Sequence, residues 1–357
     1  MGEKSDVLYL DDMPEATGFP TKVMPTSWFQ VDWSDALKIG DVKPLKYFNQ
    51  DLALFRTADG RANLTSAYCP HMGAHLGYGG TVEGCTLKCP YHGWEWNTDG
   101  TSALVPSEGK PSTSRRGLKV WDVVESNGII WTWHDSRGRP PLWDAPAERR
   151  HEDNYLPVYP HCTYTWADIR ARPQYIAENT VDLDHLIFVH KNGILPVVRE
   201  EAHIPQYTEE GHIWANRRPH PMQSSACIGI GLVVVTFPFD ESRPHRMPGV
   251  LFHCTTPIDD ERSDMFGTMM VRQDMAAEGC EGDVPVGNAL KRVEEQIKQA
   301  GRDVPIWDHM IYMERPAYTR MEGPQFMRLR RWAKQFYPEG DGGEATGSVT
   351  PIKQSAA

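Results

Sequence analysis

Two short stretches decide the fold: CPHMGAHLG at residues 69–77 and CPYHGW at residues 89–94. Each stretch begins with a cysteine and offers a histidine within the next three residues. The four candidate ligands are Cys69, His71, Cys89 and His92. Two thiolates and two imidazoles can hold either a tetrahedral zinc ion or a two-iron cluster. Glycines follow both pairs and permit tight loops whose backbone N–H groups can face a bound metal group.

A second group of candidate ligands lies in DLDHLIFVH, residues 182–190. On a helix Asp182 and His185 would lie about 60° apart and share a face. His185 and His190 would lie about 140° apart, so they can bind one metal only if the helix breaks or bulges between them. Two histidines and one carboxylate form the facial triad of non-haem Fe(II) enzymes, which leaves positions open for O₂. The carboxylate must then come from elsewhere in the chain.

Composition excludes several classes of protein. The 357 residues carry a net charge of −11, which disfavours nucleic acid and anionic lipid as partners. No stretch reaches 18 apolar residues, and the polar start of the chain lacks the apolar core of a secretory signal. Seven sparse cysteines favour a reducing environment over a disulfide scaffold. We therefore expect a cytoplasmic protein without a membrane span.

The order of predicted elements indicates an α+β protein in four parts. These are a lead-in (1–26), an all-β domain (27–140), a mixed domain (141–338) and a disordered tail (339–357). In the mixed domain, helices are predicted over 173–190, 287–300 and 326–336. Strands are predicted over 226–237, 250–256 and 265–272. These apolar strands could line a long apolar pocket, although core packing is the better prediction for any single residue, Met265, Met269 and Met270 included.

The two Cys/His stretches resemble the Rieske [2Fe–2S] domain of ring-hydroxylating oxygenases. The resemblance implies that the cysteines hold one iron and the histidines the other, with structural zinc as the alternative. Rieske proteins of respiratory complexes carry a disulfide across the two loops. Its positions here are Ala74 and Tyr91, so that bridge cannot form and the sequence is similar to the oxygenase branch.

The resemblance also implies the ligands of a mononuclear Fe(II). In Rieske oxygenases two histidines come from an Asp-x-x-His-x4-His motif and the carboxylate from a later aspartate followed by an apolar stretch. The implied ligands are His185, His190 and Asp303. Other candidates for the carboxylate are Asp283, Asp308 and Glu314. Asn179 and Asp308 are expected to lie next to the ligands.

A third implication concerns electron transfer between the two metal groups. The family assembles as a head-to-tail homotrimer that places one subunit's cluster beside the next subunit's iron. By this resemblance Asp182 bridges His185 and the partner subunit's His92. An acceptor between two imidazole N–H groups would orient both ligands.

The source of electrons and the substrate follow from further features. The chain has neither a Gly-x-Gly-x-x-Gly fingerprint nor a plant-type ferredoxin cysteine set, so we expect a separate NAD(P)H-dependent flavin and iron–sulfur reductase. The string Asp303-x-x-Ile-Trp307 and residues 330–337 resemble the branch of the 3-ketosteroid 9α-hydroxylase oxygenases and cholesterol 7-desaturases. That branch implies a helix-grip catalytic domain and a monooxygenase that uses O₂ to hydroxylate a hydrophobic polycyclic substrate, a steroid.

Two alternatives stay open at this point. One is a Rieske oxygenase or demethylase that acts on a smaller aromatic or aryl-ether compound. The other is a Rieske electron-transfer protein, which would need only the first 140 residues or so. Pro70 and the pair Ala74-His75 differ from the ketosteroid hydroxylases, so hydroxylation, desaturation and dealkylation all remain open as outcomes.

Overall fold

The structure is a computed structural model that describes residues 18–147, 158–191, 206–217, 223–238, 248–271, 280–281 and 284–338. Most of the predicted lead-in (1–17), the whole predicted tail (339–357) and the alternative ligand Asp283 lie outside the described residues. Among the described helices, none is long and apolar enough to cross a membrane.

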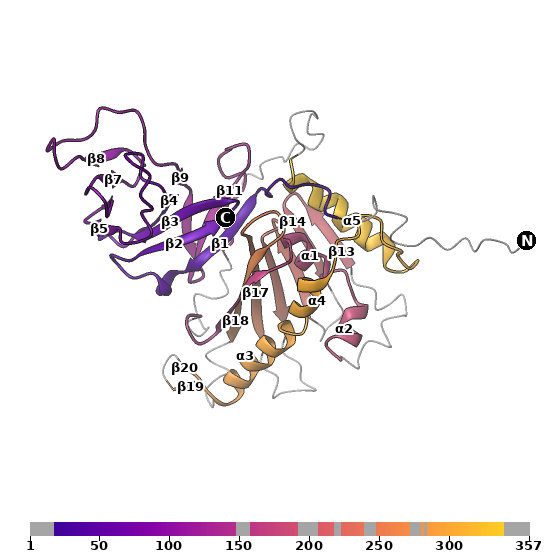
Figure 1. The fold of residues 1–357 in the computed structure, drawn as a ribbon. Helices are drawn as coiled ribbons and strands as arrows, with labels where there is room; N and C mark the ends of the chain where they lie inside the picture. Colours follow the sequence, from indigo (N-terminus) through magenta and orange to yellow (C-terminus); the bar gives the residue numbers. More distant parts are fainter. Residues whose placement is uncertain are drawn as a thin grey trace, which may run out of the picture.

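The N-terminal part consists of three small antiparallel sheets (Figure 1). The first, in the order β1-β11-β10, contains Ser27–Trp33, Ile129–His134 and Val123–Ser126. The second, β2-β3-β4-β9, contains Val42–Tyr47, Gln50–Arg56, Ala62–Ser66 and Val120–Trp121. The third, β5-β6-β7-β8, contains Thr81–Glu83, Thr86–Lys88, Glu95–Asn97 and Ser102–Leu104. Loop 69–77 precedes this third sheet, and loop 89–94 joins β6 to β7, so the two Cys/His stretches share one end of the molecule.

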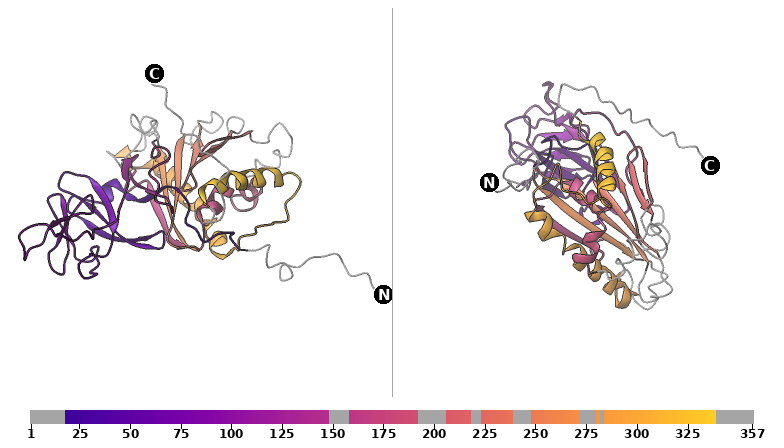
Figure 2. Two further views of the ribbon diagram at one scale, coloured as in Figure 1. Left: turned by 90° about the horizontal axis from the view of Figure 1, so that it is seen from above. Right: turned by 90° about the vertical axis from the view of Figure 1, so that its right-hand side faces the viewer.

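The C-terminal part is built on one seven-stranded antiparallel sheet in the order β12-β18-β17-β16-β15-β14-β13. These strands are Thr163–Ile169, Ser263–Val271, Gly249–Pro257, Leu232–Phe237, Ser224–Ile228, Ile213–Arg217 and Gln206–Glu210. The helices beside it are α1 Pro173–Glu178, α2 Asp184–Phe188, α3 Gly287–Ala300, α4 Val304–His309 and α5 Gly323–Ala333 (Figure 2). The other elements of the described residues are a short hairpin, β19 (Cys280–Glu281) and β20 (Val284–Pro285), and the 3₁₀ turns Ser34–Ala36 and Lys334–Phe336. The α+β prediction is confirmed, and α3 coincides with the helix predicted over 287–300.

Two predicted elements are each divided in the structure. The strand predicted over 226–237 is wrong as a single strand, because β15 and β16 form a hairpin with a turn at Gly229. Gly229 has φ +61, and a Cβ there would lie 2.1 Å from the Ser27 Oγ, so only glycine fits this turn against β1. The helix predicted over 173–190 is likewise wrong as one helix, since a turn at residues 179–183 separates α1 from α2.

One continuous apolar core joins the two parts of the chain. It includes Phe29 of β1 and Phe252 of β17, both almost completely buried. Hydrogen bonds cross the same boundary, from Trp33 Nε1 to Thr268 Oγ1 (3.2 Å) and from the Phe48 N–H to the Pro257 carbonyl (2.9 Å). The methionines of β18, Met265, Met269 and Met270, are fully buried, so the prediction that they belong to the core is confirmed.

Candidate metal centres

The two Cys/His loops close in the same way. The Cys69 N–H donates to the Ala74 carbonyl (2.9 Å), and the Cys89 N–H donates to the Trp94 carbonyl (2.8 Å). Four residues after each cysteine stands a glycine, Gly73 with φ +73 and Gly93 with φ +70, a conformation that disfavours any side chain. In both loops this geometry turns the backbone back on itself just after the histidine.

Within these loops the cysteines and histidines occupy different environments. Cys69 and Cys89 are buried among Leu76, Leu87 and Trp96, whereas His71 and His92 are exposed at the tip. The two imidazole rings lie 4.7 Å apart between centroids, and His71 stacks on Trp94 at 4.5 Å. Burial raises the pKa of the Cys69 thiol, because a thiolate without a metal is poorly solvated there.

This arrangement fits a two-iron cluster better than a single zinc ion. A tetrahedral zinc requires ligand atoms within about 3.8 Å of one another. Among the described residues, the only group of three or more potential ligands whose atoms lie within 4.8 Å is a different one, and no three of the four loop residues qualify. In addition, the buried Trp96 indole interacts with the Cys69 side chain and opposes the rise of its pKa, as expected for a donor to cluster sulfur.

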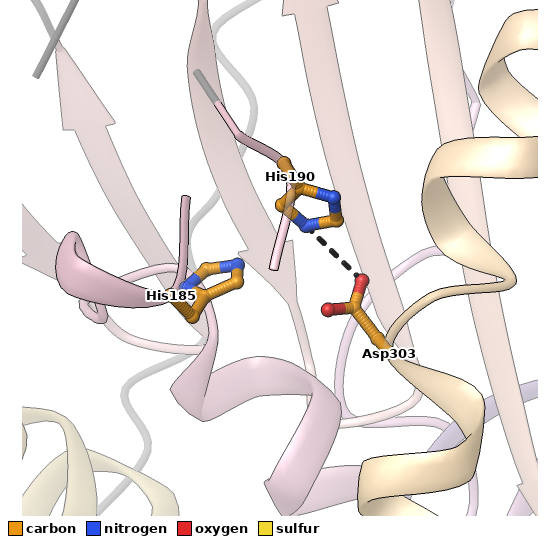
Figure 3. Close-up of side chains that lie close together, drawn as sticks. All are labelled: His185, His190 and Asp303. Carbon is orange, nitrogen blue, oxygen red and sulfur yellow. Dashed lines mark ion pairs between the residues drawn. The ribbon is translucent and has the colours of Figure 1, made fainter. Parts of the chain in front are cut away.

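The group that does qualify is His185, His190 and Asp303. His185 is on α2, His190 follows that helix by two residues, and Asp303 is the N-cap of α4 (Figure 3). The histidine rings are 5.2 Å apart between centroids, and His190 Nε2 is 3.3 Å from Asp303 Oδ2. All three ligand atoms lie within 4.8 Å of one another, so one metal ion could contact all of them after the side chains adjust.

The predicted break between the two histidines is confirmed. Helix α2 ends at Phe188, and the His190 N–H reaches back to the His185 carbonyl at 3.4 Å, an i to i−5 contact wider than an α-helical turn. Without this change the two rings would face different sides of the helix. Asp303 is brought in by the apolar packing of α4, whose Trp307 is buried beside it.

A polar network holds the His190 ring. Gln299 Oε1 lies 3.1 Å from His190 Nδ1, and Arg302 donates both to this oxygen (3.0 Å) and to the His190 carbonyl (3.2 Å). Glu295 accepts from the Gln299 amide nitrogen. Because Gln299 Oε1 is an acceptor, it selects the tautomer with the proton on Nδ1 and leaves the Nε2 lone pair facing Asp303. Sequence reasoning missed Gln299, and nothing in the helix pattern distinguishes it from Gln296.

Asp182 lies in the turn that begins α2. Its Oδ1 accepts the His185 N–H at 3.2 Å and lies 3.7 Å from His185 Nδ1. Burial raises the pKa of Asp182, but the His185 ring and backbone N–H lower it more, so the net shift is downward. His185 Nδ1 is buried and has no hydrogen-bond partner. Asp182 itself stays 32% exposed, and it is therefore accessible from outside the subunit.

A cavity opens beside the three ligands. Its sheet wall comes from three strands, with Ser225 from β15, Val233, Val235 and Phe237 from β16, and Leu251 and His253 from β17. The period of two puts every second side chain on this face, so the wall is mostly apolar. The opposite side is formed by α1, α2, α3 and the start of α4.

The other predicted site residues lie in different places. Asn179 lines the cavity. Asp308 does not, because its Oδ1 accepts the Arg170 N–H at 2.8 Å on the other side of α4. Glu314, an alternative carboxylate ligand, is exposed.

The motif near the C-terminus has a structural role beside the site. Arg330 of α5 forms a largely buried bidentate ion pair with Glu178 at the end of α1 (2.8 and 2.9 Å). This pair ties α5 to the segment that leads directly into Asn179 and Asp182.

In comparison with known proteins, two family models match successive parts of the chain. The family model described as "Rieske [2Fe-2S] domain" matches residues 27–122. The model described as "3-Ketosteroid 9alpha-hydroxylase C-terminal domain" matches residues 132–337, more than half of the chain.

Individual relatives share less than a third of their residues with this chain. Cholesterol 7-desaturase of Bombyx mori is 29% identical over 327 residues, 88% of this chain and 70% of that protein. The oxygenase component of a 3-ketosteroid-9-alpha-monooxygenase of Rhodococcus rhodochrous is 25% identical over 337 residues, 87% and 83% of the two chains. A solved structure of the QL mutant of Pseudomonas putida CBB5 NdmA with theobromine is similar in fold, with a TM-score of 0.67, 21% identity, and coverage of 86% of this chain and 89% of that chain.

Proposed function

Because this chain belongs to the Rieske oxygenases that carry the 3-ketosteroid 9α-hydroxylase C-terminal domain, we propose that it is the oxygenase component of a multicomponent monooxygenase that hydroxylates a steroid. The observation that carries the proposal is the presence of both candidate metal sites in one chain. Loops 69–77 and 89–94 are shaped for a [2Fe–2S] cluster, and a two-histidine, one-carboxylate triad borders a cavity with an apolar wall.

The chain's own residues would divide the work between two sites. Cys69, His71, Cys89 and His92 would hold the [2Fe–2S] cluster. His185, His190 and Asp303 would hold Fe(II), which when bound supplies the activation of O₂. Gln299 orients His190, and the apolar strands exclude water from the cavity. In the overall reaction one oxygen atom enters a substrate C–H bond and the other leaves as water, with two electrons and two protons supplied from outside.

A steroid suits this cavity on chemical grounds. The wall formed by β16 and β17 is mostly apolar, and a steroid is a rigid, mostly hydrocarbon molecule. The proposal also draws on the two relatives whose names specify a steroid or sterol reaction.

Electrons would come from a separate NAD(P)H-dependent reductase and pass between subunits of a homotrimer. In support, Asp182 is partly exposed beside His185, and His92 is exposed at the cluster tip. Large apolar side chains are exposed near both places, Met72 and Tyr91 at the tip and Phe188 at the end of α2. We propose that these surfaces meet and that Asp182 accepts a hydrogen bond from the partner subunit's His92.

Metal analysis and product analysis test the proposal together. Purified protein should contain about three irons per chain, two in the cluster and one in the triad. With an NADH-linked reductase, O₂ uptake should depend on a steroid and should yield a product heavier by one oxygen atom. Mass spectrometry is needed so that uncoupled O₂ use is not counted as turnover.

Other results would lead to other conclusions. Two irons and no oxygenation would indicate an electron carrier, and stoichiometric zinc would exclude both readings. Turnover of aromatic or aryl-ether compounds alone would show that the steroid part is wrong while the oxygenase part holds. Sedimentation velocity of the iron-loaded protein tests the trimer separately.

A further inference from the structure

A largely buried tyrosine–histidine pair lies in the sheet next to the triad. Tyr164 of β12, Gly267 of β18 and His253 of β17 form one row across three neighbouring strands, in which Tyr164 pairs with Gly267 and Gly267 pairs with His253. The Tyr164 hydroxyl reaches past the middle strand and lies 2.7 Å from His253 Nε2. The proposed function does not account for this pair.

Gly267 makes the contact possible. A Cβ at this position would lie 1.9 Å from two carbons of the Tyr164 ring. Any other residue would push the phenol ring away from the row. The ring therefore fills the space that Gly267 leaves because it has no side chain. The hydrogen bond is thus built into the register of three strands rather than into a surface loop.

His253 also lines the cavity that contains the three proposed iron ligands. Its lining neighbours on β16 and β17 are Val233, Val235, Phe237 and Leu251, all apolar. A polar ring in such a wall is unfavourable unless its nitrogen atoms have partners. Tyr164 is the partner of Nε2. Apart from its own sheet, the His253 side chain is next to the cavity, where a ligand could be the partner of Nδ1.

The protonation of the pair follows from its burial. Burial lowers the pKa of His253 to about 4, so the imidazole is neutral near pH 7. Burial raises the pKa of the Tyr164 phenol, which therefore keeps its proton. A phenol is the better donor and a neutral imidazole nitrogen the better acceptor, so Tyr164 donates to Nε2 and the ring proton of His253 sits on Nδ1.

We infer that His253, held in one tautomer by Tyr164, is the residue of the wall formed by β16 and β17 that hydrogen-bonds an oxygen atom of the substrate, a ketone or hydroxyl oxygen on an otherwise hydrocarbon skeleton. This contact would orient the substrate relative to the triad and would select oxygenated steroids over hydrocarbons of the same shape. The inference rests on the proposed steroid function and adds the polar contact to it.

The test compares ligands that differ by one oxygen atom. Androstane, its 3-ketone and its 17-ketone are titrated into anaerobic, iron-loaded protein by calorimetry. The wild type should bind one of the ketones about 5- to 150-fold more tightly than androstane, the range expected for one buried hydrogen bond. In His253→Leu this ratio should fall to near one, with androstane affinity almost unchanged.

Further variants separate recognition from packing. His253→Gln keeps an N–H donor and should restore part of the ketone preference. Tyr164→Phe frees the tautomer and should reduce the preference without removing it. The matched control Val235→Ala, on the neighbouring strand of the same wall, should weaken binding of all three ligands by a similar factor. Circular dichroism and cluster absorbance check that each variant is folded.

Each outcome decides the matter. A ketone preference that persists in His253→Leu overturns the inference, as does a wild type that binds ketones and androstane equally. If His253→Leu does not fold, an unchanged preference in Tyr164→Phe overturns the role of the pair. A wild type that binds none of the three steroids overturns the proposed substrate, and the inference falls with it.

Discussion

Replacing Gln299 by leucine should weaken Fe(II) binding without unfolding the protein. Gln299 Oε1 is the partner of His190 Nδ1 at 3.1 Å, and the His190 side chain is only 15% exposed. Leucine fills similar space but accepts no hydrogen bond, so a buried N–H loses its partner at a cost of about 1–3 kcal/mol. Loss of such a partner typically lowers metal affinity about 10- to 100-fold. A 10- to 100-fold change in affinity corresponds to about 1.4–2.7 kcal/mol, which lies within the cost of the lost hydrogen bond.

The affinity is best measured by anaerobic competition with an Fe(II) chelator of known strength. Cluster absorbance in the same sample serves as an internal check, because the loops at residues 69–94 do not involve Gln299. Lys298→Leu, an exposed change on the adjacent position of α3, is the matched control and should bind iron like the wild type. A Gln299→Leu protein whose Fe(II) affinity stays within about twofold of the wild type would refute the positioning role. Loss of the hydrogen-bond partner of a ligating histidine is expected to lower that affinity tenfold or more.

Three further perturbations test the site and its support. Asp182→Ala should keep both metals but lose most turnover, because the proposed bridge between subunits is gone; iron loss, measured by metal analysis, would instead make Asp182 a ligand. Glu178→Gln should lower the free energy of unfolding in urea by about 3–5 kcal/mol, because the largely buried Arg330 loses its anion, and a loss below about 1 kcal/mol would contradict this. Burial lowers the pKa of His134 from the usual 6.5 to about 4, so the unfolded chain binds the proton first and stability should fall by up to about 3 kcal/mol as pH drops through this interval. His134→Phe should flatten that part of the stability curve, and a curve parallel to the wild type would contradict the assignment.

Local spacing was sufficient for some features. The two Cys/His stretches form matched loops because each contains, within six residues, a cysteine, a histidine and a glycine at the position that needs a positive φ. The helix at 287–300 was predictable because its apolar residues recur with the helical period. Both depend on contacts between residues close in the chain.

The divided elements show where local patterns fail. Residues 226–237 are mostly apolar, interrupted only by Gly229, Gly231 and Thr236, so their pattern suggests one strand. The hairpin instead depends on the approach of β1 to Gly229. Likewise the turn that separates α1 from α2 forms where Asn216 of β14 donates to the Thr180 carbonyl at 2.7 Å. In both places a partner distant in the chain determines the local conformation.

The motifs alone determined which candidate ligands are available for the two metal groups and the order of those ligands along the chain. This is possible because a ligand must be a cysteine, a histidine or a carboxylate, and neighbouring ligands must be spaced so that they can reach one metal. Tertiary structure decided which of them meet. It brings Asp303 to within 3.3 Å of His190 across more than a hundred residues of chain, turns Asp308 toward Arg170, and adds Gln299 and the Tyr164–His253 pair. The physical reason is that these contacts come from packing helices on a sheet and from strand register, and neither leaves a signature in the residues near a motif.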